Sequence, residues 1–423
     1  MSRRIGKLSV CALLGFVFSW LVSCNPAPTA SSSQEVEFWT MQLQPEFTQY
    51  FEQLIATFES ETDVEVRWTD VPWSAMESKI LTAVSAKTAP DVVNLNPNFA
   101  SQLATRNAWL DLESEVSPEV KQQYLPNIWR ASTIDETSFG LPWYLTTRVT
   151  IYNQELLAQA GVEVPQTYAE TAVVARQLKE KTGKYAFFVT LVPGDSGEVL
   201  ESLVQMGVQL VDEQGQAAFN TPAGVAAFQY WVELYQQGLL PPEVLTQGHR
   251  HAIELYQAGE TALLSSGAEF LGAIANNAPT IAEVSAAAPQ ITGQTGKKNV
   301  AVMNLVIPRE TDKPQDALDF ALYVTNTENQ LAFAKEANVL PSTEEALQQY
   351  IKELQQQDST TPVEQAREVS AQQIDEAEVL VPAMENLNQL QKIIYENMQA
   401  AMLEQKSVEQ AVEDAANQWN ASS

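Results

Sequence analysis

The sequence predicts an α/β architecture, because short apolar strands alternate with amphipathic helices from residue 35 onward. Residues 36–40 are typical of a strand, and Phe47, Phe51, Leu54 and Phe58 then lie on one face of a helix. Strand–helix–strand repetition of this kind indicates a parallel sheet that is covered by helices.

The alternation continues through the rest of the chain. The further strands are expected at 64–68, 91–95, 186–190, 262–265 and 300–307, and the further helices at 75–86, 173–181, 199–206, 224–237 and 314–324. From residue 342 the chain is expected to be almost wholly helical. Phe228, Trp231 and Tyr235 recur at helical spacing, which favours a place in the core over contact with a ligand.

Composition and charge exclude several classes of protein. The chain has 423 residues, of which 45% are hydrophobic, so it is not a disordered chain. It has 24 Lys and Arg against 53 Asp and Glu, and the net charge of −29 disfavours binding to nucleic acid. Two cysteines exclude a disulfide framework. His249 and His251, two positions apart on a predicted helix, point in different directions, so neither a metal site nor a cofactor is expected.

The N-terminus is typical of an export signal. Arg3, Arg4 and Lys7 precede the uncharged apolar run 8–22, which is shorter than the roughly 20 residues of a membrane span. The run ends in Leu-Val-Ser-Cys, which resembles the bacterial lipobox. We therefore expect a signal peptide at 1–23, with a lipidated Cys24 beginning a flexible tether that ends at residue 34. The alternative is a plain secretory signal in which Cys24 is incidental.

Five segments match the sequence pattern of one protein family. They are 89–93 (APDVV), 103–112 (LA…WLDL), 151–168 (IYN…AG…PQTY), 256–262 (YQAGETA) and 317–330 (A…F…Y…T…E…Q). They resemble the bacterial extracellular solute-binding proteins of ABC importers, in the sugar-binding branch that is similar to maltose-binding protein. The expected C-terminal helices, 382–403 and 407–419, also fit this family.

The resemblance implies two α/β lobes of the type II periplasmic-binding-protein fold, joined by crossing hinge strands. The N-terminal lobe would be 35–145 with 301–340, and the C-terminal lobe 146–300 with 341–423. The protein would be a monomer outside the cytoplasmic membrane (in the periplasm or on the outer face of the cell membrane), anchored through Cys24. It would not be an enzyme. It would capture a mono-, di- or oligosaccharide or a glycoside between the lobes and deliver it to the membrane subunits of an ABC permease.

A sugar presents an apolar face and a rim of hydroxyl groups, so its site needs aromatic rings and short polar side chains in loops that follow strands. The residues that the resemblance and these loops indicate as ligand-binding are Trp39, Gln42, Gln44, Trp73, Asn96, Asn98, Trp143, Tyr144, Thr146, Arg148, Asp195, Ser266, Glu269, Phe270, Met303 and Asn304. The alternatives are a core position for Trp39, a helix cap for Asn98, a surface contact with its helix for Trp73, and an ordinary helix-capping turn around Asp195.

One segment departs from the family pattern. Relatives carry an aromatic residue before the return strand, whereas residues 301–304 here read Ala-Val-Met-Asn, so either Met303 packs against the ligand or the site is built differently.

Two other functions stay open. A polyamine or another cationic solute would suit the acidic charge, with Glu269 and Asp195 as the available acids. An extracellular glycosidase would need a pair of carboxylates at a defined separation, and no segment of the sequence indicates such a pair.

Overall fold

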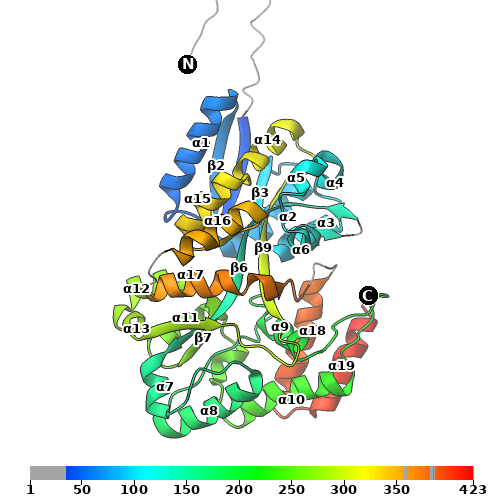
Figure 1. Cartoon of the computed structure of the whole chain (residues 1–423). Coiled ribbons are helices and arrows are strands. Elements are labelled where there is room, and N and C mark those ends of the chain that lie inside the picture. The colour runs from blue at the N-terminus through cyan, green and yellow to red at the C-terminus, as the bar shows by residue number, and fades with distance from the viewer. Residues whose placement is uncertain (1–34, 135, 357–360, 382–383, 385, 423) are drawn as a thin grey trace, which may run out of the picture. The chain divides into compact units, whose positions relative to one another are not determined.

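The computed structural model describes residues 35–134, 136–356, 361–381, 384 and 386–422 (Figure 1). The predicted signal peptide, Cys24 and the tether lie outside these described residues. The predicted α/β class is confirmed, because strands and helices alternate along most of the described chain.

The largest sheet is parallel at one end and antiparallel at the other. β1 (Glu35–Met41) lies between β2 (Glu65–Val71) and β3 (Val92–Leu95), and the three strands are parallel, as predicted. Next to β3 follow β9 (Lys298–Val306), β6 (Leu141–Asn153) and β10 (Leu340–Pro341), each antiparallel to its neighbour. The prediction of a parallel sheet is therefore wrong for the later strands.

Strand β6 changes its partners along its length. Residues 141–147 pair with β9, whereas Arg148 onward pairs with β7 (Leu263–Gly267), and β8 (Ser285–Pro289) pairs with Val149 onward. The short β11 (Ala377–Glu378) pairs with the start of β9. One strand of 13 residues thus pairs with β9 and β10 in its first half and with β7 and β8 in its second half, and it runs from the upper to the lower part of the ribbon in Figure 1.

Two apolar clusters pack on the sheet of β1, β2, β3 and β9, and we call them together the first core. α1 illustrates why its helices form: Phe51, Leu54, Ile55 and Phe58 repeat on one face and are buried. The elements around this core are α1 (Thr48–Thr62), α2 (Trp73–Ala86), α3 (Pro97–Ala104), α4 (Leu112–Glu115), α5 (Pro118–Lys121), α6 (Pro126–Ala131), the hairpin of β4 (Thr133–Ile134) and β5 (Thr137–Ser138), α14 (Pro314–Val324), α15 (Thr327–Ala337) and α16 (Glu344–Gln355). The buried face of α16 packs here, although its residues fall in the range predicted for the C-terminal lobe. The lobe boundaries stay a prediction.

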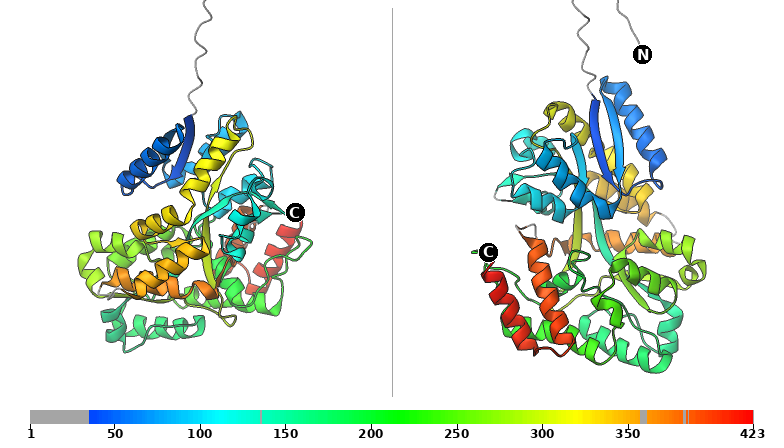
Figure 2. Two further views of the ribbon diagram at one scale, coloured as in Figure 1. Left: turned by 45° about the horizontal axis from the view of Figure 1, so that its top comes forward. Right: turned by 180° about the vertical axis from the view of Figure 1, so that it is seen from behind.

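A second core surrounds β7 and β8. Its elements are α7 (Gln154–Ala160), α8 (Tyr168–Thr182), α9 (Glu198–Gln205), α10 (Pro222–Gln236), the 3₁₀ helix η1 (Pro242–Leu245), α11 (His249–Gln257), α12 (Phe270–Asn277), α13 (Pro279–Glu283), α18 (Leu387–Met402) and α19 (Val408–Asn420). α18 and α19 lie side by side, as both views of Figure 2 show. Phe228 and Trp231 lie in this core, as predicted. The strand predicted at 186–190 is wrong, because this extended segment forms only isolated bonds at Tyr185 and Ala186.

A buried polar network joins the chain segments where β6 changes partners. Thr147 Oγ1 lies 2.8 Å from Ser370 Oγ of α17 (Pro362–Gln372), and accepts from Gln373 Nε2 at 2.8 Å. Gln373 also donates to the Arg148 carbonyl and precedes the 3₁₀ helix η2 (Ile374–Glu376). Gln290 Oε1 accepts from the Asn299 backbone N–H at the start of β9. Because buried polar groups need partners, this network fixes the register of both crossing strands.

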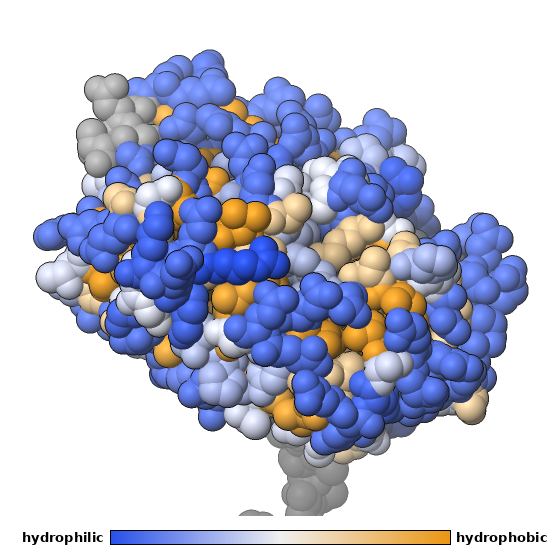
Figure 3. Space-filling model, turned by 90° about the horizontal axis from the view of Figure 1, so that it is seen from below, coloured by the Kyte–Doolittle hydropathy of each residue, from blue (hydrophilic) through white to orange (hydrophobic). Residues whose placement is uncertain are grey.

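The surface seen from below in Figure 3 is mostly hydrophilic, with apolar residues scattered between charged and polar ones. Among the described residues, the large hydrophobic side chains that are most exposed are Trp73, Val173 and Leu403. No helix in that part of the chain is both long and apolar enough to cross a membrane.

The first turn of α10 depends on a glycine. A Cβ atom at Gly224 would lie 1.8 Å from the Phe219 carbonyl oxygen, and that oxygen belongs to the backbone. We expect Gly224→Ala to lower the free energy of unfolding by about 1–3 kcal/mol, because the turn must shift. Gly272→Ala in α12 is the control, since its Cβ meets no atom within 4 Å. Chemical denaturation of both variants checks this, and equal stabilities would contradict the contact.

Candidate functional site

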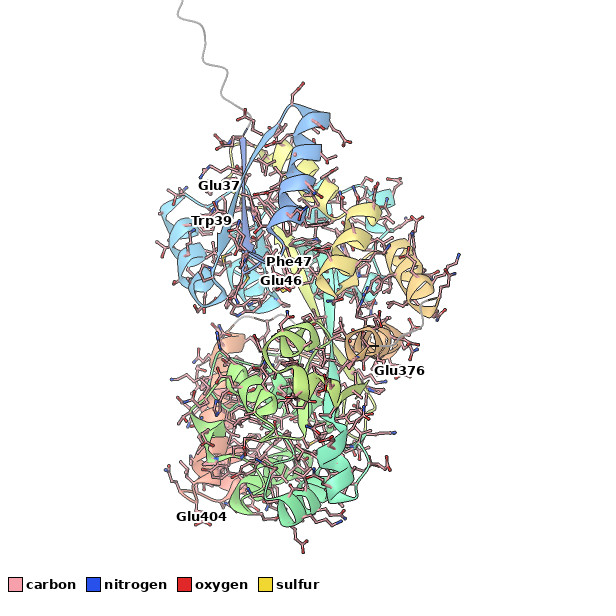
Figure 4. The ribbon with its side chains drawn as sticks, turned by 90° about the vertical axis from the view of Figure 1, so that its left-hand side faces the viewer. Glu37, Trp39, Glu46, Phe47, Glu376 and Glu404 are labelled. Carbon is pink, nitrogen blue, oxygen red and sulfur yellow. The ribbon has the colours of Figure 1, made fainter. Side chains whose placement is uncertain are left out.

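The loop that follows β1 is held in place by Asp70 of the neighbouring strand. The Asp70 carboxylate accepts hydrogen bonds from Thr40 Oγ1 at 2.6 Å, from the Leu43 N–H at 2.9 Å and from the Gln44 N–H at 3.2 Å. Glu46 and Phe47, just beyond, lie at the end of the first core that is nearer the lower part of the ribbon (Figure 4). The side chains of Gln42 and Gln44 are exposed on this fixed loop.

Trp73 lies beside this loop. The Trp73 backbone N–H donates to Gln42 Oε1 at 3.2 Å, and the Trp73 side chain is 46% exposed. β1 and β2 are parallel, so the segments after them meet at one edge of the sheet. The structure thus brings together three predicted residues, Gln42, Gln44 and Trp73, as an aromatic ring beside two amides.

Three predicted ligand contacts are instead part of the first core. Trp143 is 1% exposed, and its ring stacks on Phe333 with centroids 4.9 Å apart. Trp39 is 7% exposed; it lies on the same side of β1 as Glu37, to which it donates a hydrogen bond, and Lys79 Nζ lies 3.8 Å from its ring centroid (Figure 4). Met303 packs in the same cluster as Trp39. These positions correct the expectation of ligand contact for all three.

The predicted asparagines also have structural roles. Asn96 Oδ1 accepts from the Phe99 N–H and caps α3, so the capping residue is Asn96 and not Asn98. The side chain of Asn98 lies outside the part of the structure that is described. Asn304 is buried, with Oδ1 2.5 Å from Ser132 Oγ, which corrects its expected place at a ligand.

Trp143 and Leu145 are buried, whereas Tyr144 and Thr146 stay partly exposed. The pairing of β6 with β9 shifts its register between Pro142 and Tyr144, and the Tyr144 ring packs edge-on to Trp143 and Phe333, with centroids 5.0 and 5.3 Å apart. Burial raises the pKa of the Tyr144 hydroxyl, and the Glu269 carboxylate raises it further. Tyr144 therefore lies within electrostatic reach of a residue that follows β7.

Arg148 is the first residue of β6 that pairs with β7, and its charge is neutralised within the protein. Its Nε donates to Glu201 Oε2 at 2.7 Å, and its Nη2 donates to Glu201 Oε1 and Ser196 Oγ, each at 3.3 Å. Both side chains of the ion pair are largely buried, at 19% and 11% exposure. Because the guanidinium group is already bonded to a carboxylate, Arg148 is not free to bind an anion. We call Arg148, Glu201, Ser196 and the neighbouring residues His249, Ser266, Glu269 and Phe270 the wall of the site.

His249 connects three of the segments that carry predicted residues. Its Nε2 lies 3.2 Å from Ser266 Oγ, its backbone N–H donates to Asp195 Oδ1 at 2.6 Å, and its ring packs edge-on to Phe270 at 6.2 Å. Burial lowers the pKa of His249 to about 4, and the nearby Arg148 lowers it too. The imidazole is therefore neutral at pH 7.

Glu269 is a half-buried acid without an ion pair in the described part of the chain. Its two carboxylate oxygens lie where a Cβ atom of Gly267 would be, each 2.1 Å from that position. Burial raises the pKa of Glu269 to about 7, against the lowering effects of a backbone hydrogen bond and of Arg148. The absence of a side chain at Gly267 allows this carboxyl group to approach the backbone.

Helix α18 holds the loop of residues 193–197 against this wall. The Ser196 carbonyl accepts from Tyr395 OH at 2.6 Å and from Gln391 Nε2 at 2.7 Å, and Gln391 Oε1 accepts from the Gly194 N–H. Asp195 does not cap α9, whose N-cap residue is Gly197; its carboxylate accepts from the N–H of His249, the first residue of α11.

The site contains residues that the sequence did not indicate: His249, Glu198 and Glu201. The pattern of α9 held a signal for Glu201, because an acid falls between the apolar residues of the buried face, Leu200 and Leu203. The described residues contain no group of three or more His, Cys, Asp or Glu that could hold a metal ion. The wall offers hydroxyl, imidazole, amide and carboxyl groups beside aromatic rings, which suits a solute with many hydrogen-bonding groups.

The two tryptophans should behave differently on truncation. We expect Trp143→Ala to lower the free energy of unfolding by about 3–5 kcal/mol, because it removes a ring from the core. Trp73→Ala should change it by less than about 0.5 kcal/mol, since that side chain is half exposed. Urea denaturation measures both, and a stable Trp143→Ala protein would contradict the core assignment.

Glu269 should make stability depend on pH. Its pKa is raised from 4.5 to about 7 on folding, so its protonated form favours the folded state. The contribution of protonated Glu269 to the free energy of unfolding is fully present below pH 4.5 and is lost as the pH rises through 7. We expect Glu269→Gln to be as stable as the parent at pH 4.5 and more stable at pH 8, on the order of 1–3 kcal/mol. Glu283→Gln, at an exposed position, is the control; a pH-independent difference for Glu269→Gln would contradict the shift.

Comparisons with known proteins agree with this architecture. The sequence profile described as "Bacterial extracellular solute-binding protein" matches residues 44–331. The diacetylchitobiose binding protein DasA of Streptomyces coelicolor is 26% identical over 316 residues, which are 71% of each chain. The arabinooligosaccharide-binding protein of Halalkalibacterium halodurans is 24% identical over 311 residues, which are 70% of this chain and 68% of that one.

Solved structures extend the likeness over nearly the whole chain. A candidate oligosaccharide periplasmic-binding protein of Synechococcus sp. MITs9220 is 47% identical, with a TM-score of 0.87, over 91% of this chain and 98% of that chain. The cyclic alpha-maltosyl-1,6-maltose binding protein of Arthrobacter globiformis shares the fold, with a TM-score of 0.77 at 22% identity, over 92% of this chain and 98% of that one. The predicted two-lobe fold of the periplasmic-binding-protein type is thereby confirmed, and the chain belongs to the family of bacterial extracellular solute-binding proteins.

Proposed function

We propose that the protein captures a sugar outside the cytoplasmic membrane and delivers it to an ABC permease. The observation that carries the proposal is the cluster of Arg148, His249, Ser266, Glu269 and Phe270 next to Tyr144, where β6 passes from one ladder to the other. Relatives named for diacetylchitobiose, arabinooligosaccharide and galactooligosaccharide binding support a carbohydrate ligand.

Residues of both cores would contact the bound sugar. Trp73, Gln42 and Gln44 lie after the strands of the first core, whereas Ser266 lies in β7 of the second core and Glu269 and Phe270 follow that strand. A sugar that contacts both groups favours the closed arrangement by its difference in affinity for the closed and open states. Two ring contacts of about 1 kcal/mol each and several hydrogen bonds of about 0.5–1.5 kcal/mol each would give micromolar binding, about 8 kcal/mol.

The remaining parts of the proposal concern location and partners. Lipidation at Cys24 would hold a monomer at the membrane, with residues 24–34 as its tether. The protein would act by binding and release and would carry out no reaction, in line with relatives that are named as binding proteins.

A second candidate ligand is a cationic solute, favoured by the Glu269 carboxyl group, which lacks an ion pair among the described residues. Binding of a polyamine would weaken steeply with added salt, whereas binding of a neutral sugar would hardly change.

Isothermal titration calorimetry with a panel of chito-, arabino-, galacto- and malto-oligosaccharides tests the sugar assignment. We expect at least one member to bind with a micromolar Kd. Gly267→Ala should weaken that binding about tenfold, since its Cβ displaces the Glu269 carboxyl group. Gly272→Ala, five residues further along the chain in α12, should bind like the parent, since its Cβ meets no atom within 4 Å. No heat with any sugar, or equal affinity for the Gly267→Ala protein, would contradict the proposed site.

A further inference from the structure

A small cavity lies inside the second core and shares Glu198 with the candidate site. It has a volume of about 40 Å³, on the helix side of β6 and β7. Thr150 and Ser265, which are directly paired across these two strands, line it together with Glu198 of α9. The rings of Tyr168, Phe187, Phe188 and Trp231 line the rest, with Gln290. A space of this size holds one to three groups of the size of water.

The carboxyl group of Glu198 has no cationic partner in the described part of the chain. The nearest cation is Arg148, whose guanidinium group is already bonded to Glu201 and Ser196. Two acids, Glu198 and Glu201, therefore share one arginine. The hydroxyl of Ser265 is the side-chain hydrogen-bond partner of Glu198.

The other polar groups around the cavity are engaged elsewhere. Tyr168 OH donates to Gln205 Oε1 at 2.6 Å, Trp231 Nε1 donates to Ser202 Oγ at 2.9 Å, and Gln290 Oε1 accepts from the Asn299 N–H. Thr150 Oγ1 donates to the Pro289 carbonyl, which leaves its oxygen lone pairs available. Thr171 Oγ1, which also lines the cavity, donates to the Thr167 carbonyl. The lining thus combines one carboxylate, the hydroxyls of Thr150, Ser265, Thr171 and Tyr168, and aromatic rings, and it includes no second acid.

We infer that this cavity binds a small monovalent cation, of the size of potassium or ammonium, between the Glu198 carboxylate and the hydroxyls of Thr150 and Ser265. The oxygens are the ligands that such ions prefer, and the surrounding rings attract a cation. A divalent ion such as calcium would need more carboxylates to balance its charge than the one that this cavity offers. The bound cation supplies the charge that Arg148 cannot give to both acids.

The charge state of Glu198 sets the conditions of the test. Burial raises the pKa of Glu198 to about 7; Arg148 lowers it, Glu201 raises it, and the Ser265 hydrogen bond lowers it. Tyr168 of α8 and Tyr395 of α18 also face this group electrostatically and are neutral at pH 8. The carboxylate is thus available at pH 8 and protonated at pH 5.5.

Thermal unfolding at constant ionic strength provides the first test. At pH 8, replacing choline chloride by potassium chloride or ammonium chloride at ten times Kd should raise the Tm by about 2 °C, because the ion binds only the folded state. The shift should vanish at pH 5.5 and in Glu198→Gln. It should persist in Glu180→Gln, a control at an exposed position of α8. An equal shift in Glu198→Gln, or no shift in the parent, would overturn the proposal.

Crystals soaked in rubidium acetate at pH 8 provide the second test, which does not depend on stability. We expect an anomalous peak between Glu198 and the Thr150–Ser265 pair in the parent protein and in Glu180→Gln, and none in Glu198→Gln. A cavity that contains only water in the parent would overturn the proposal. Neither test requires a sugar, so its failure leaves the proposed function untouched.

Discussion

Both parts of the fold depend on one strand, β6, which pairs with different strands in its two halves. Up to Thr147, β6 is an inner strand of the first sheet, and from Arg148 it is paired with β7 and β8. A strand cannot slip by one residue without turning every side chain to the other face, so both cores fix the same register. The polar network of Thr147, Ser370 and Gln373 lies at this transition, where an unpaired polar group would be costly. Side chains at this point of the strand are therefore held in fixed directions.

The same strand explains the charge arrangement of the candidate site. Arg148 emerges just beyond the transition, and its bond to Glu201 neutralises it without a ligand. Glu269, His249 and Glu198 lie around this guanidinium group, and each titrates away from its ordinary pKa because water is excluded. A neutral solute with many hydroxyl groups can bind beside these side chains without breaking the Arg148–Glu201 ion pair, whereas an anion would have to compete with Glu201 for Arg148.

The sequence predicted the fold class and most elements because apolar periodicity is a local property. α1, α8 and α10 formed where their apolar faces indicated, and the strands β1, β2 and β3 are parallel as expected. The antiparallel pairing of β9 with β3 and β6 was not predicted, because strands that pair from distant parts of the sequence leave no local pattern. Residues 186–190 read as a strand by composition but belong to no ladder, and the nearest bridge is the isolated one at Tyr185.

The candidate site was only partly predictable for a similar reason. Trp143 and Tyr144 are neighbours on β6, but the pairing register shifts beside them, so simple alternation does not decide their directions and both rings contact Phe333. Tyr144 stays partly exposed while Trp143 stacks on Phe333, a residue 190 positions later in the chain that no local pattern connects to it. Ser266 lies at the end of β7, and Glu269 and Phe270 follow directly after this strand, so the three are close in the sequence. His249 was missed because only its contact with Ser266, from another segment, brings it there.

The central claim is that the two halves close on an uncharged carbohydrate. Native mass spectrometry of the protein purified from its own cells under gentle conditions tests this most directly. The account predicts a bound species whose mass corresponds to a neutral saccharide and which is released on mild activation. A co-purified amine or organic anion in its place would contradict it.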